Sequence, residues 1–421
     1  MSETENVEDY PLSEVPYDAR HGFSSILSVL LGFTFFSATM WAGGTLGVSF
    51  KIWPDLVLII VAGNILLSAY VAILSYIASK SGLNTVLMGR FCFGRLGSKW
   101  ADLLLSATQV GWYAWGTATI AIVLSSLLGL DDSWQILLMI FFGFAFCQTA
   151  YIGYRGLEWL SKISVPLIVI LLIFSMWVAI SDAGGISGLF KIIPMEAMGV
   201  GQAITIVVGT FISGGTQATN WTRFARTEKE AVSASVIAFF IGNGLMLFGG
   251  AIGALVYQES DIVNILAIQG LLLFGIVMLF ANIWTTQDNT IYNFSVAGCN
   301  LLNTNRRRAI TLAGAGIGTV IAILGMYEWL IPYMEWLGLL IPPIGGIIMA
   351  DFFFVRKGAY EKLSEKKDGL YPDFNYAGLM AYIAGCLAAL PGFGIPPLNG
   401  IITSALVYIL LNRLTKIFCK N

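Results

Sequence analysis

Long runs of apolar residues alternate with short polar connections along almost the whole chain. Twelve of these runs are long enough to cross about 30 Å of hydrocarbon as a helix that rises about 1.5 Å per residue. The pattern therefore predicts an all-α integral membrane protein with 12 transmembrane helices. The predicted spans lie near residues 25–48, 54–78, 100–129, 134–153, 160–181, 200–222, 231–256, 271–300, 309–326, 329–350, 374–392 and 397–418.

The sixth run contains a stretch whose composition is unusual for a lipid-facing helix. Residues 209–221 read G-T-F-I-S-G-G-T-Q-A-T-N-W. Glycine, serine, threonine and asparagine lower helix propensity, and in hydrocarbon each backbone group released from a helix must find another partner. Transporters bind substrates at such breaks, because two half-helix ends expose backbone donors and acceptors near the bilayer midplane. The stretch therefore predicts a binding site.

The two halves of the chain share two features at similar spacing. The first span contains T-F-F-S at Thr34–Ser37, and the sixth contains T-F-I-S at Thr210–Ser213, 176 residues later. About 172 residues separate Trp112 in the third span from Trp284 in the eighth. Because five spans separate the copies, the second copy would enter the membrane from the opposite face. The predicted parts are a polar arm at 1–24, a first inverted repeat at 25–181, a second at 200–350, a cytoplasmic loop at 351–373, and two extra helices with the C-terminus at 374–421.

Composition and charge agree with a membrane protein. Hydrophobic residues make up 57% of the chain and charged residues only 11%, with a mean hydropathy of +0.78. In soluble domains about a quarter of the residues are charged. If the N-terminus is cytoplasmic, only Lys51 and Lys191 of the 23 basic residues lie on the outer side, as the positive-inside rule requires. We therefore expect a multi-pass protein of the plasma (inner) membrane with both termini in the cytoplasm.

The chain lacks the sequence patterns of an enzyme or an ATP-driven pump. Its one histidine, His21, lies in the polar arm, and no G-x-S-x-G, H-E-x-x-H or phosphate-binding loop occurs. A channel would need a continuous polar lining, and the aromatic residues Trp112 and Phe211 within the spans argue against one. These observations favour a secondary transporter.

The third span carries T-Q-V-G-W near its middle, with Gln109 and Trp112 one helical turn apart. Most tryptophans of membrane proteins lie at the interfaces, and Trp112 is too deep for that. An indole beside an amide suits a flat ligand that stacks on the ring and bonds to the amide, with Phe211 as the opposite wall. The alternative is a packing tryptophan, with Gln109 bonded across a helix interface.

The eighth span places Asn282, Thr285 and Thr286 on one helical face, because they are three and four residues apart. Two adjacent hydroxyls are hard oxygen ligands that suit a small cation. The alternative is that the hydroxyls bond to carbonyls one turn earlier, as threonines often do in membrane helices. If the first span is also distorted, carbonyls near Gly32 and Phe35 would complete an oxygen cage. The two halves together predict a sodium site.

One carboxylate, Asp288, lies well inside a predicted span. An ionisable residue within the membrane is expected to serve the function, and here it would carry protons. It would otherwise face an inner aqueous cavity or brace neighbouring helices. The sequence leaves both interpretations open.

Five motifs in the same order resemble the cytosine permeases of the nucleobase:cation symporter (purine-cytosine permease) family. The similarity runs from about Val15 to the C-terminus. The motifs are L-G-F-T-F-F-S-A-T-M-W-A-G-G-T-L-G (Leu31–Gly47), T-Q-V-G-W (Thr108–Trp112), G-T-F-I-S-G-G-T (Gly209–Thr216), N-I-W-T-T-Q-D-N (Asn282–Asn289) and I-P-P-I-G-G-I-I-M-A-D (Ile341–Asp351).

This resemblance implies a leucine-transporter-type fold with two inverted five-helix repeats plus two extra helices. It also implies cytosine import by cation symport, with sodium as the coupling ion in the better understood relatives, and alternating access around a midplane site. We expect no other cofactor, no enzyme activity, no nucleic-acid partner, contact with membrane lipid, and function as a monomer. The residues implied to bind the nucleobase are Gln109, Trp112, Thr210, Phe211, Ser213, Gly214 and Gln287. Those implied to bind sodium are Gly32, Phe35, Asn282, Thr285 and Thr286.

Two positions depart from the family pattern and keep other substrates open. Gln287 stands where the relatives carry asparagine, and Thr210 stands where they often carry serine. The side chain of Gln287 is one methylene longer and would reach a different part of the substrate. A purine, hydantoin or thiamine-like substrate is therefore an alternative to cytosine. Coupling to protons through Asp288 is the alternative to coupling to sodium.

Overall fold

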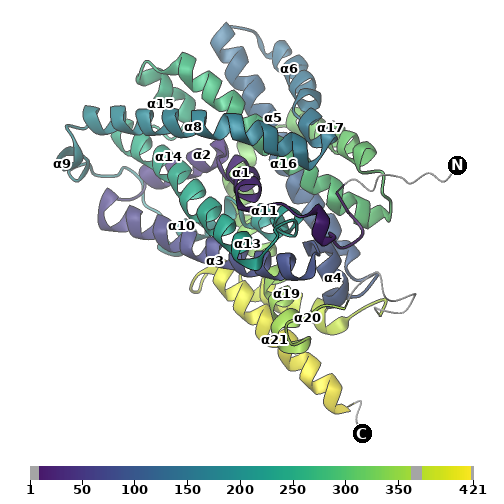
Figure 1. The fold of residues 1–421 in the computed structure, drawn as a ribbon. Helices are drawn as coiled ribbons and strands as arrows, with labels where there is room; N and C mark the ends of the chain where they lie inside the picture. The colour runs from purple at the N-terminus through teal and green to yellow at the C-terminus, as the bar shows by residue number, and fades with distance from the viewer. Residues whose placement is uncertain (1–8, 362–371, 419–421) are drawn as a thin grey trace, which may run out of the picture.

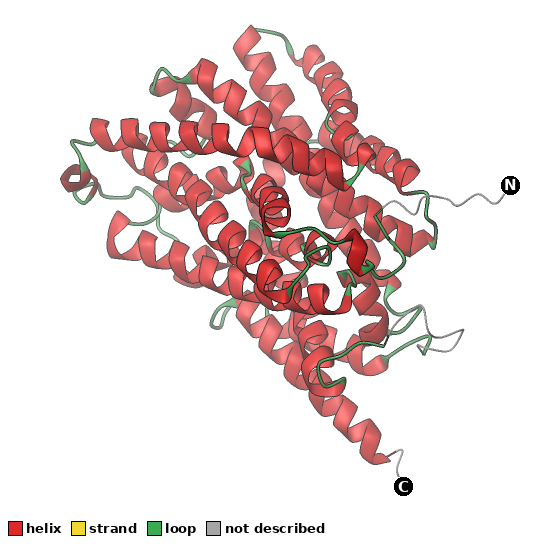
Figure 2. Ribbon diagram, viewed as in Figure 1, coloured by secondary structure: helices red, strands yellow, loops and turns green. Residues whose placement is uncertain are grey.

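The computed structural model describes residues 9–361 and 372–418, and within these ranges the chain is helical without a strand (Figure 2). Each of the twelve predicted spans coincides with one or more helices. The helices are α1 (Phe23–Thr34), α2 (Ser37–Gly47), α3 (Val57–Ser81), α4 (Thr85–Phe93), α5 (Lys99–Leu128), α6 (Asp132–Ala145), α7 (Gln148–Ile152), α8 (Tyr154–Asp182), α9 (Ile186–Leu189), α10 (Val200–Gly209), α11 (Ile212–Gln217), α12 (Thr219–Thr222), α13 (Glu228–Val236), α14 (Asn243–Tyr257), α15 (Ile262–Ile268), α16 (Leu272–Leu302), α17 (Arg307–Ile323), α18 (Leu330–Leu340), α19 (Pro342–Ala350), α20 (Tyr376–Ala388) and α21 (Pro396–Phe418). Short 3-10 or π-helical turns are η1 (Tyr17–Ala19), η2 (Ile52–Leu56), η3 (Ile237–Gly242), η4 (Met326–Trp329) and η5 (Asp351–Val355).

Several of these helices are long and apolar enough to cross a membrane. Within the described ranges there are 7 such helices, or up to 8 if the bent pair α1–α2 forms one span. Two further apolar helices, α10 and α20, are shorter. The all-helical membrane architecture is therefore confirmed, whereas the count of 12 spans stays a prediction.

Both predicted helix breaks are present. Helix α1 ends at Thr34 and α2 begins at Ser37, and the two axes differ by 53° across this break. The backbone between them is extended at Phe36, with φ −128° and ψ 133°. The second break separates α10 from α11, where Phe211 leaves the helical region with φ −136° and ψ 10°. The low helix propensity read from residues 209–221 thus coincides with a real interruption, and the first span has the distortion that the sodium site required.

The helices around the breaks approach one another closely through small residues. A Cβ atom built on Gly43 would lie 2.1 Å from the carbonyl oxygen of Leu247, and one on Gly250 would lie 1.9 Å from that of Met40. Any side chain at these positions would force α2 and α14 apart. Small residues allow the same close approach between other membrane helices.

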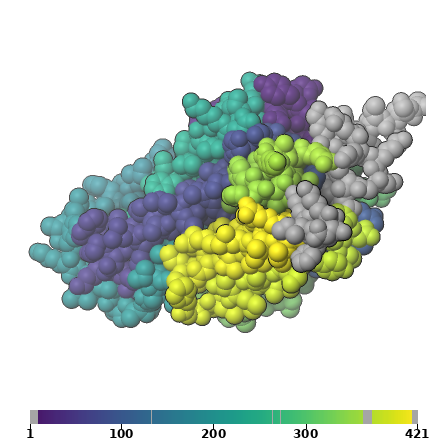
Figure 3. Space-filling view, turned by 90° about the horizontal axis from the view of Figure 1, so that it is seen from below, coloured from purple at the N-terminus to yellow at the C-terminus, as the bar shows by residue number. Residues whose placement is uncertain are grey.

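The broken helices lie at the centre of the molecule, and the last two helices, α20 and α21, lie at its periphery. In Figure 1, α1 and α11 are surrounded by the long helices α3, α5, α8 and α16, and α8 crosses the view below α6 and α15. Helices α20 and α21 project from the lower edge, and they cover much of the face seen in Figure 3. Most large buried side chains, including Trp115 and Trp221, belong to one continuous cluster around the breaks.

An N-terminal arm, residues 9–22, packs against the connection between α12 and α13. The backbone amide of His21 donates to the carbonyl of Phe224 at 2.6 Å. The guanidinium of Arg223 is fully buried and donates to the backbone carbonyls of Asp9, at 2.7 Å, and Tyr10, at 2.8 Å. The carboxylate of Asp9 lies 3.4 Å from the guanidinium of Arg307 on α17. The arm is thus held by buried polar contacts.

We expect Arg223→Met to lower the free energy of unfolding by about 2 kcal/mol, because it leaves partly buried carbonyl groups of the arm unpaired. The measurement is denaturant or thermal unfolding of the purified protein in detergent. Arg226→Met is the matched control, because the side chain of Arg226 is exposed and should contribute little. An equal loss in both variants would contradict the structural role of Arg223.

The arm should also respond to pH through His21. Its ring stacks on Tyr154 with centroids 4.6 Å apart. Burial lowers the pKa of His21 below its ordinary value of 6.5, and Arg226 and Arg155 oppose its protonation, whereas Glu158 favours it. The neutral ring therefore stabilises the docked arm fully above about pH 6.5, and this contribution is lost as the pH falls below that value. We expect the apparent melting temperature of the wild type to fall slightly more than that of His21→Phe on acidification; parallel curves would contradict this.

Candidate functional site

The break between α10 and α11 leaves backbone groups without helical partners. Within the described residues, no backbone hydrogen bond reaches the carbonyls of Gly209 and Thr210, and none is made by the amides of Ser213 and Gly214. Acceptors and donors therefore face each other across the break at Phe211. Half-helix ends of this kind can bind the polar edge of a small ligand.

Trp112 on α5 lies directly against this break. Its indole N–H donates to the hydroxyl of Ser213 at 3.0 Å, and only 5% of the residue is exposed. Edge-to-face contacts to Phe36 and Tyr333 have centroid distances of 5.6 and 5.1 Å. The ring is thereby held in one orientation between α2, α11 and α18.

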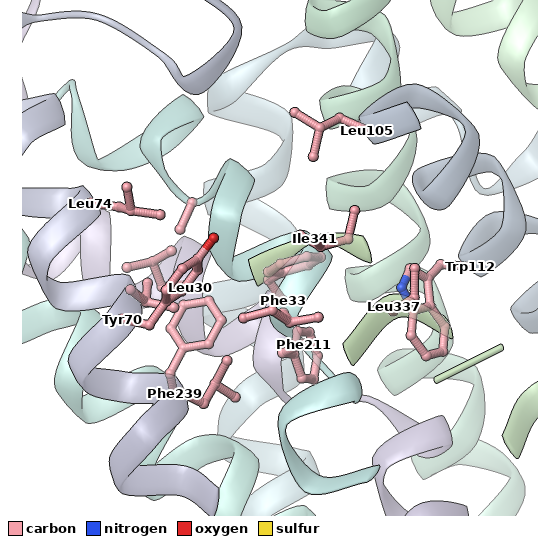
Figure 4. Packing of buried hydrophobic residues seen from close by; sticks show 14 of the residues in the cluster. Leu30, Phe33, Tyr70, Leu74, Leu105, Trp112, Phe211, Phe239, Leu337 and Ile341 are labelled. Carbon is pink, nitrogen blue, oxygen red and sulfur yellow. The ribbon is translucent and has the colours of Figure 1, made fainter. Parts of the chain in front are cut away.

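Three aromatic rings from the two breaks meet opposite Trp112. Phe33 and Phe211 are in edge-to-face contact with centroids 5.1 Å apart, and Phe36 lies 6.4 Å from Phe211. Figure 4 shows Phe33 and Phe211 close together, with Trp112 to one side. Two of these rings, Phe33 and Phe36, belong to the first break and were not predicted from the sequence.

A small cavity lies between these rings. Its volume is about 10 Å³, which is room for about one water molecule. Pockets that bind drug-sized ligands enclose about 300–1,000 Å³. The site is therefore closed, and the rings must separate before a planar heterocycle can enter. The cavity is lined by Phe33, Phe36, Trp112, Thr210, Phe211, Gly214, Thr286 and Thr290.

The structure brings most of the predicted nucleobase residues to this cavity. Trp112, Thr210, Phe211 and Gly214 line it, and Ser213 is bonded to the Trp112 indole at its edge. Thr290, one turn after Thr286 on α16, is a lining residue that was not predicted from the sequence. Its spacing of four residues from Thr286 was a signal that could have found it.

Gln109 lies one turn before Trp112 on the same face of α5. Its side chain is fully buried, and neither amide atom has a hydrogen-bond partner among the described residues. A buried amide without a partner is unusual and calls for a ligand or water. Gln109 therefore suits a ligand that offers both a donor and an acceptor.

Gln287 points elsewhere. Its amide nitrogen donates to the carbonyl of Tyr113 and, at 3.1 Å, to the hydroxyl of Thr117, both on α5. It fills the interface between α5 and α16 and does not line the cavity. Successive residues of a helix are about 100° apart, so Gln287 leaves the face on which Thr286 lies.

Four of the five predicted sodium ligands meet where the first break touches α16. The hydroxyl oxygen of Thr286 lies 3.3 Å from the carbonyl oxygen of Phe35, 3.5 Å from that of Phe33 and 3.2 Å from that of Asn282. The hydroxyl of Thr285 is 3.0 Å from the same Asn282 carbonyl. One hydroxyl proton can serve only one acceptor. This cluster of neutral oxygens therefore fits a hard cation.

Gly32, the fifth predicted sodium ligand, packs against α8. A Cβ atom built on it would lie 2.1 Å from the hydroxyl oxygen of Ser161 on α8, which is why glycine is required there. The Ser161 hydroxyl is buried and has no partner among the described residues. Sequence spacing could not connect Ser161 to the first break, because the contact is tertiary.

Asp288 faces away from the cavity. Its carboxylate accepts hydrogen bonds from the hydroxyl of Thr149, at 2.9 Å, and the amide of Asn289, at 3.1 Å. Trp284 in turn donates to the Thr149 hydroxyl at 3.3 Å. These contacts join α16 to α7, as expected of a residue that braces neighbouring helices.

A profile of the protein family described as permease for cytosine/purines, uracil, thiamine and allantoin matches residues 14–412. The chain belongs to this permease family. The cytosine permease of Escherichia coli (strain K12) is 39% identical over 414 residues, which are 98% of this permease and 95% of the relative. The allantoin permease of Bacillus subtilis (strain 168) is 24% identical over 88% of this permease and 86% of that protein.

Solved structures share the fold of the permease. A closed conformation of Mhp1, a nucleobase-cation-symport-1 family transporter with bromovinylhydantoin bound, has a TM-score of 0.84 at 18% identity and covers 96% of this chain and 94% of that one. The inward-facing conformation of Mhp1 has a TM-score of 0.81 at 17% identity, with coverages of 96% and 93%. A Na⁺-coupled sialic acid symporter has a TM-score of 0.70 at 14% identity, with coverages of 94% and 90%.

These similarities confirm the leucine-transporter-type fold and the family expected from the motifs. The permease is a multi-pass membrane protein of the nucleobase:cation symporter family, and its relatives are permeases and not enzymes.

Proposed function

We propose that the permease imports cytosine together with sodium. One observation carries this proposal: Thr286 lines the aromatic cavity and also belongs to the oxygen cluster at the first break. A cation held there and a ring held in the cavity would share this side chain and the adjoining segment Phe33–Phe36. Binding of one would thus change the binding of the other.

The proposed coupling follows from the position of the two breaks. Sodium bound by the carbonyls of Phe33 and Phe35 and the hydroxyls of α16 would fix the first break against that helix. This fixes Phe33 and Phe36 next to Trp112 and so forms one side of the substrate slot. Coupling requires that sodium binds the conformations with different affinity. Loss of sodium on the cytoplasmic side would loosen the slot and release the substrate.

Cytosine suits the chemistry of the slot. Its flat ring can stack between Trp112 and Phe211 once these separate. The unpaired amide of Gln109 and the free backbone groups around Ser213 and Gly214 offer donors and acceptors to its polar edge. The 39% identity with a cytosine permease supports this choice. Allantoin is the second candidate, because a relative that is 24% identical carries that name.

The proposal also covers the orientation of the permease in the membrane and the free energy that drives uptake. The distribution of basic residues supports a plasma-membrane location with both termini in the cytoplasm. We also propose 12 spans arranged as two inverted repeats, 25–181 and 200–350, and a functional monomer. One sodium ion that enters down a tenfold gradient supplies about 1.4 kcal/mol, and about 2.3 kcal/mol more per 100 mV of inward potential.

Uptake into proteoliposomes tests this function. Radiolabelled cytosine should accumulate inside vesicles with an inward sodium gradient, and replacement of sodium by choline at constant pH should abolish accumulation. Undiminished uptake in choline would contradict sodium coupling. An inward proton gradient in choline then shows whether protons drive the uptake. Competition by unlabelled allantoin, hydantoin, purine and thiamine identifies a different substrate if cytosine fails.

A further inference from the structure

We propose that Asn243 is a positioning residue for the nucleobase site and that it acts through Thr210. This inference rests on the proposed function, because its readout is the affinity for the transported heterocycle. Asn243 is the first residue of α14, directly after the π-helical turn η3 (Ile237–Gly242). Such turns often occur at functional sites. Asn243 itself does not line the cavity.

Asn243 joins three separate elements by hydrogen bonds. Its amide nitrogen donates to the side-chain oxygen of Asn64 on α3 at 2.8 Å and to the hydroxyl of Thr210 at 3.2 Å. All three side chains are at most 2% exposed. Both amide protons of Asn243 are therefore used, one toward α3 and one toward the break between α10 and α11.

The hydroxyl of Thr210 has no donor left for a substrate in this arrangement. It donates to the carbonyl of Val207 one turn earlier at 2.7 Å and accepts the bond from Asn243. Thr210 thus closes the last turn of α10, and Asn243 holds that turn in place. The part of Thr210 that remains for the ligand is its backbone carbonyl, which has no backbone partner.

Gly242, the residue before Asn243, contacts the first break. A Cβ atom built on Gly242 would lie 2.6 Å from the hydroxyl oxygen of Thr34, the last residue of α1. Gly242 therefore contacts the first break, and Asn243 contacts the second. This turn sets the distance between the cation cluster and the free carbonyls of Gly209 and Thr210. Without Asn243, we expect those carbonyls to lose their fixed orientation toward the ligand.

A double-mutant cycle tests this inference. The affinity for cytosine, or for whichever heterocycle the wild type binds best, is measured by titration calorimetry in saturating sodium. Asn243→Ala and Thr210→Val should each weaken binding about tenfold, because each removes one buried hydrogen bond. Thr210→Ser, which keeps the hydroxyl, should stay within about twofold of the wild type. Because the residues act through one bond, the double variant should be no weaker than either single variant.

Further variants and readouts separate positioning from general damage. Asn64→Ala removes the other hydrogen-bond partner of Asn243 and should weaken heterocycle binding by less than tenfold. This variant replaces Asn243→Ala in the test if Asn243→Ala does not fold. Thr311→Val on α17 removes a comparable bond from hydroxyl to carbonyl, at 3.0 Å, and should leave the affinity unchanged. Stabilisation by sodium alone should persist in Asn243→Ala.

Three results would overturn the inference. The first is additive losses, about 100-fold in the double variant, which would mean that the Thr210 hydroxyl contacts the ligand directly. The second is an unchanged affinity in Asn243→Ala, and the third is an equal loss in Thr311→Val. If the wild type binds none of the heterocycles, the proposed function itself fails and the inference falls with it.

Discussion

Replacement of Trp112 by alanine should weaken cytosine binding by about 100-fold. Stacking of a base on an aromatic side chain contributes about 1–3 kcal/mol, and about 1.4 kcal/mol corresponds to a factor of ten. The variant also removes the hydrogen bond that holds Ser213 at the second break. The measurement is calorimetric titration of the purified permease with cytosine in sodium buffer, together with uptake into proteoliposomes.

Two controls accompany this variant. Trp112→Phe keeps a ring but loses the indole N–H, so it should recover part of the affinity. Trp177→Ala removes a tryptophan that is 61% exposed on the outer surface of α8 and should bind cytosine as the wild type does. Unchanged cytosine affinity in Trp112→Ala would show that the aromatic cavity is not the binding site.

Replacement of Thr286 by valine should raise the sodium concentration needed for half-maximal uptake. Valine has the same shape but no oxygen, so the cluster formed with the carbonyls of Phe33, Phe35 and Asn282 loses one ligand and its contact to α16. Loss of a residue that only supports a metal ligand weakens metal binding about 10–100-fold. Thr286 would be a ligand itself, so we expect its loss to weaken sodium binding by about 100-fold. The measurement is the sodium concentration that gives half-maximal uptake.

Matched variants make the sodium experiment specific. Thr286→Ser keeps the hydroxyl and should retain sodium-dependent uptake. Thr311→Val, which lies on α17 away from both breaks, should behave like the wild type. An unchanged half-maximal sodium concentration in Thr286→Val would place the coupling ion elsewhere, and a new dependence on the proton gradient would direct attention to Asp288.

The helix breaks could be predicted because their cause is local. Glycine and hydroxyl residues at 209–221 lower helix propensity wherever they stand, and the structure has an interruption at that place. The face shared by Asn282, Thr285 and Thr286 followed from helical spacing alone. The sodium site required that carbonyls of a distorted first span reach this face of α16, and the structure has that contact.

Other parts of the site depend on contacts between distant segments. The bond from Asn243 to Asn64 joins residues that are 179 positions apart, and Arg223 reaches the arm residue Asp9 across 214 positions. Neither pairing has a periodic signal in one sequence. Gln287 was placed at the substrate by its motif, whereas its rotation about α16 directs it to α5. A motif gives the neighbourhood of a residue but not the direction of its side chain.

The two breaks also account for the closed cavity. The rings of Phe33 and Phe36 come from the first break and fill the space in which a heterocycle would stack. Phe36 also contacts Trp115 with centroids 5.5 Å apart, and Trp115 stacks on Tyr327 at 6.0 Å. Opening toward one side of the membrane therefore requires this aromatic cluster to separate.

The most direct test of sodium-coupled transport is the affinity of the purified permease for cytosine with sodium and with choline at equal ionic strength. Because coupling between two ligands is reciprocal, the account predicts tighter cytosine binding in sodium and, equally, tighter sodium binding in cytosine. Both effects should vanish in Thr286→Val at sodium concentrations that just saturate the wild type. Equal cytosine affinity in sodium and choline would contradict the central claim that one closed site joins the ion to the nucleobase.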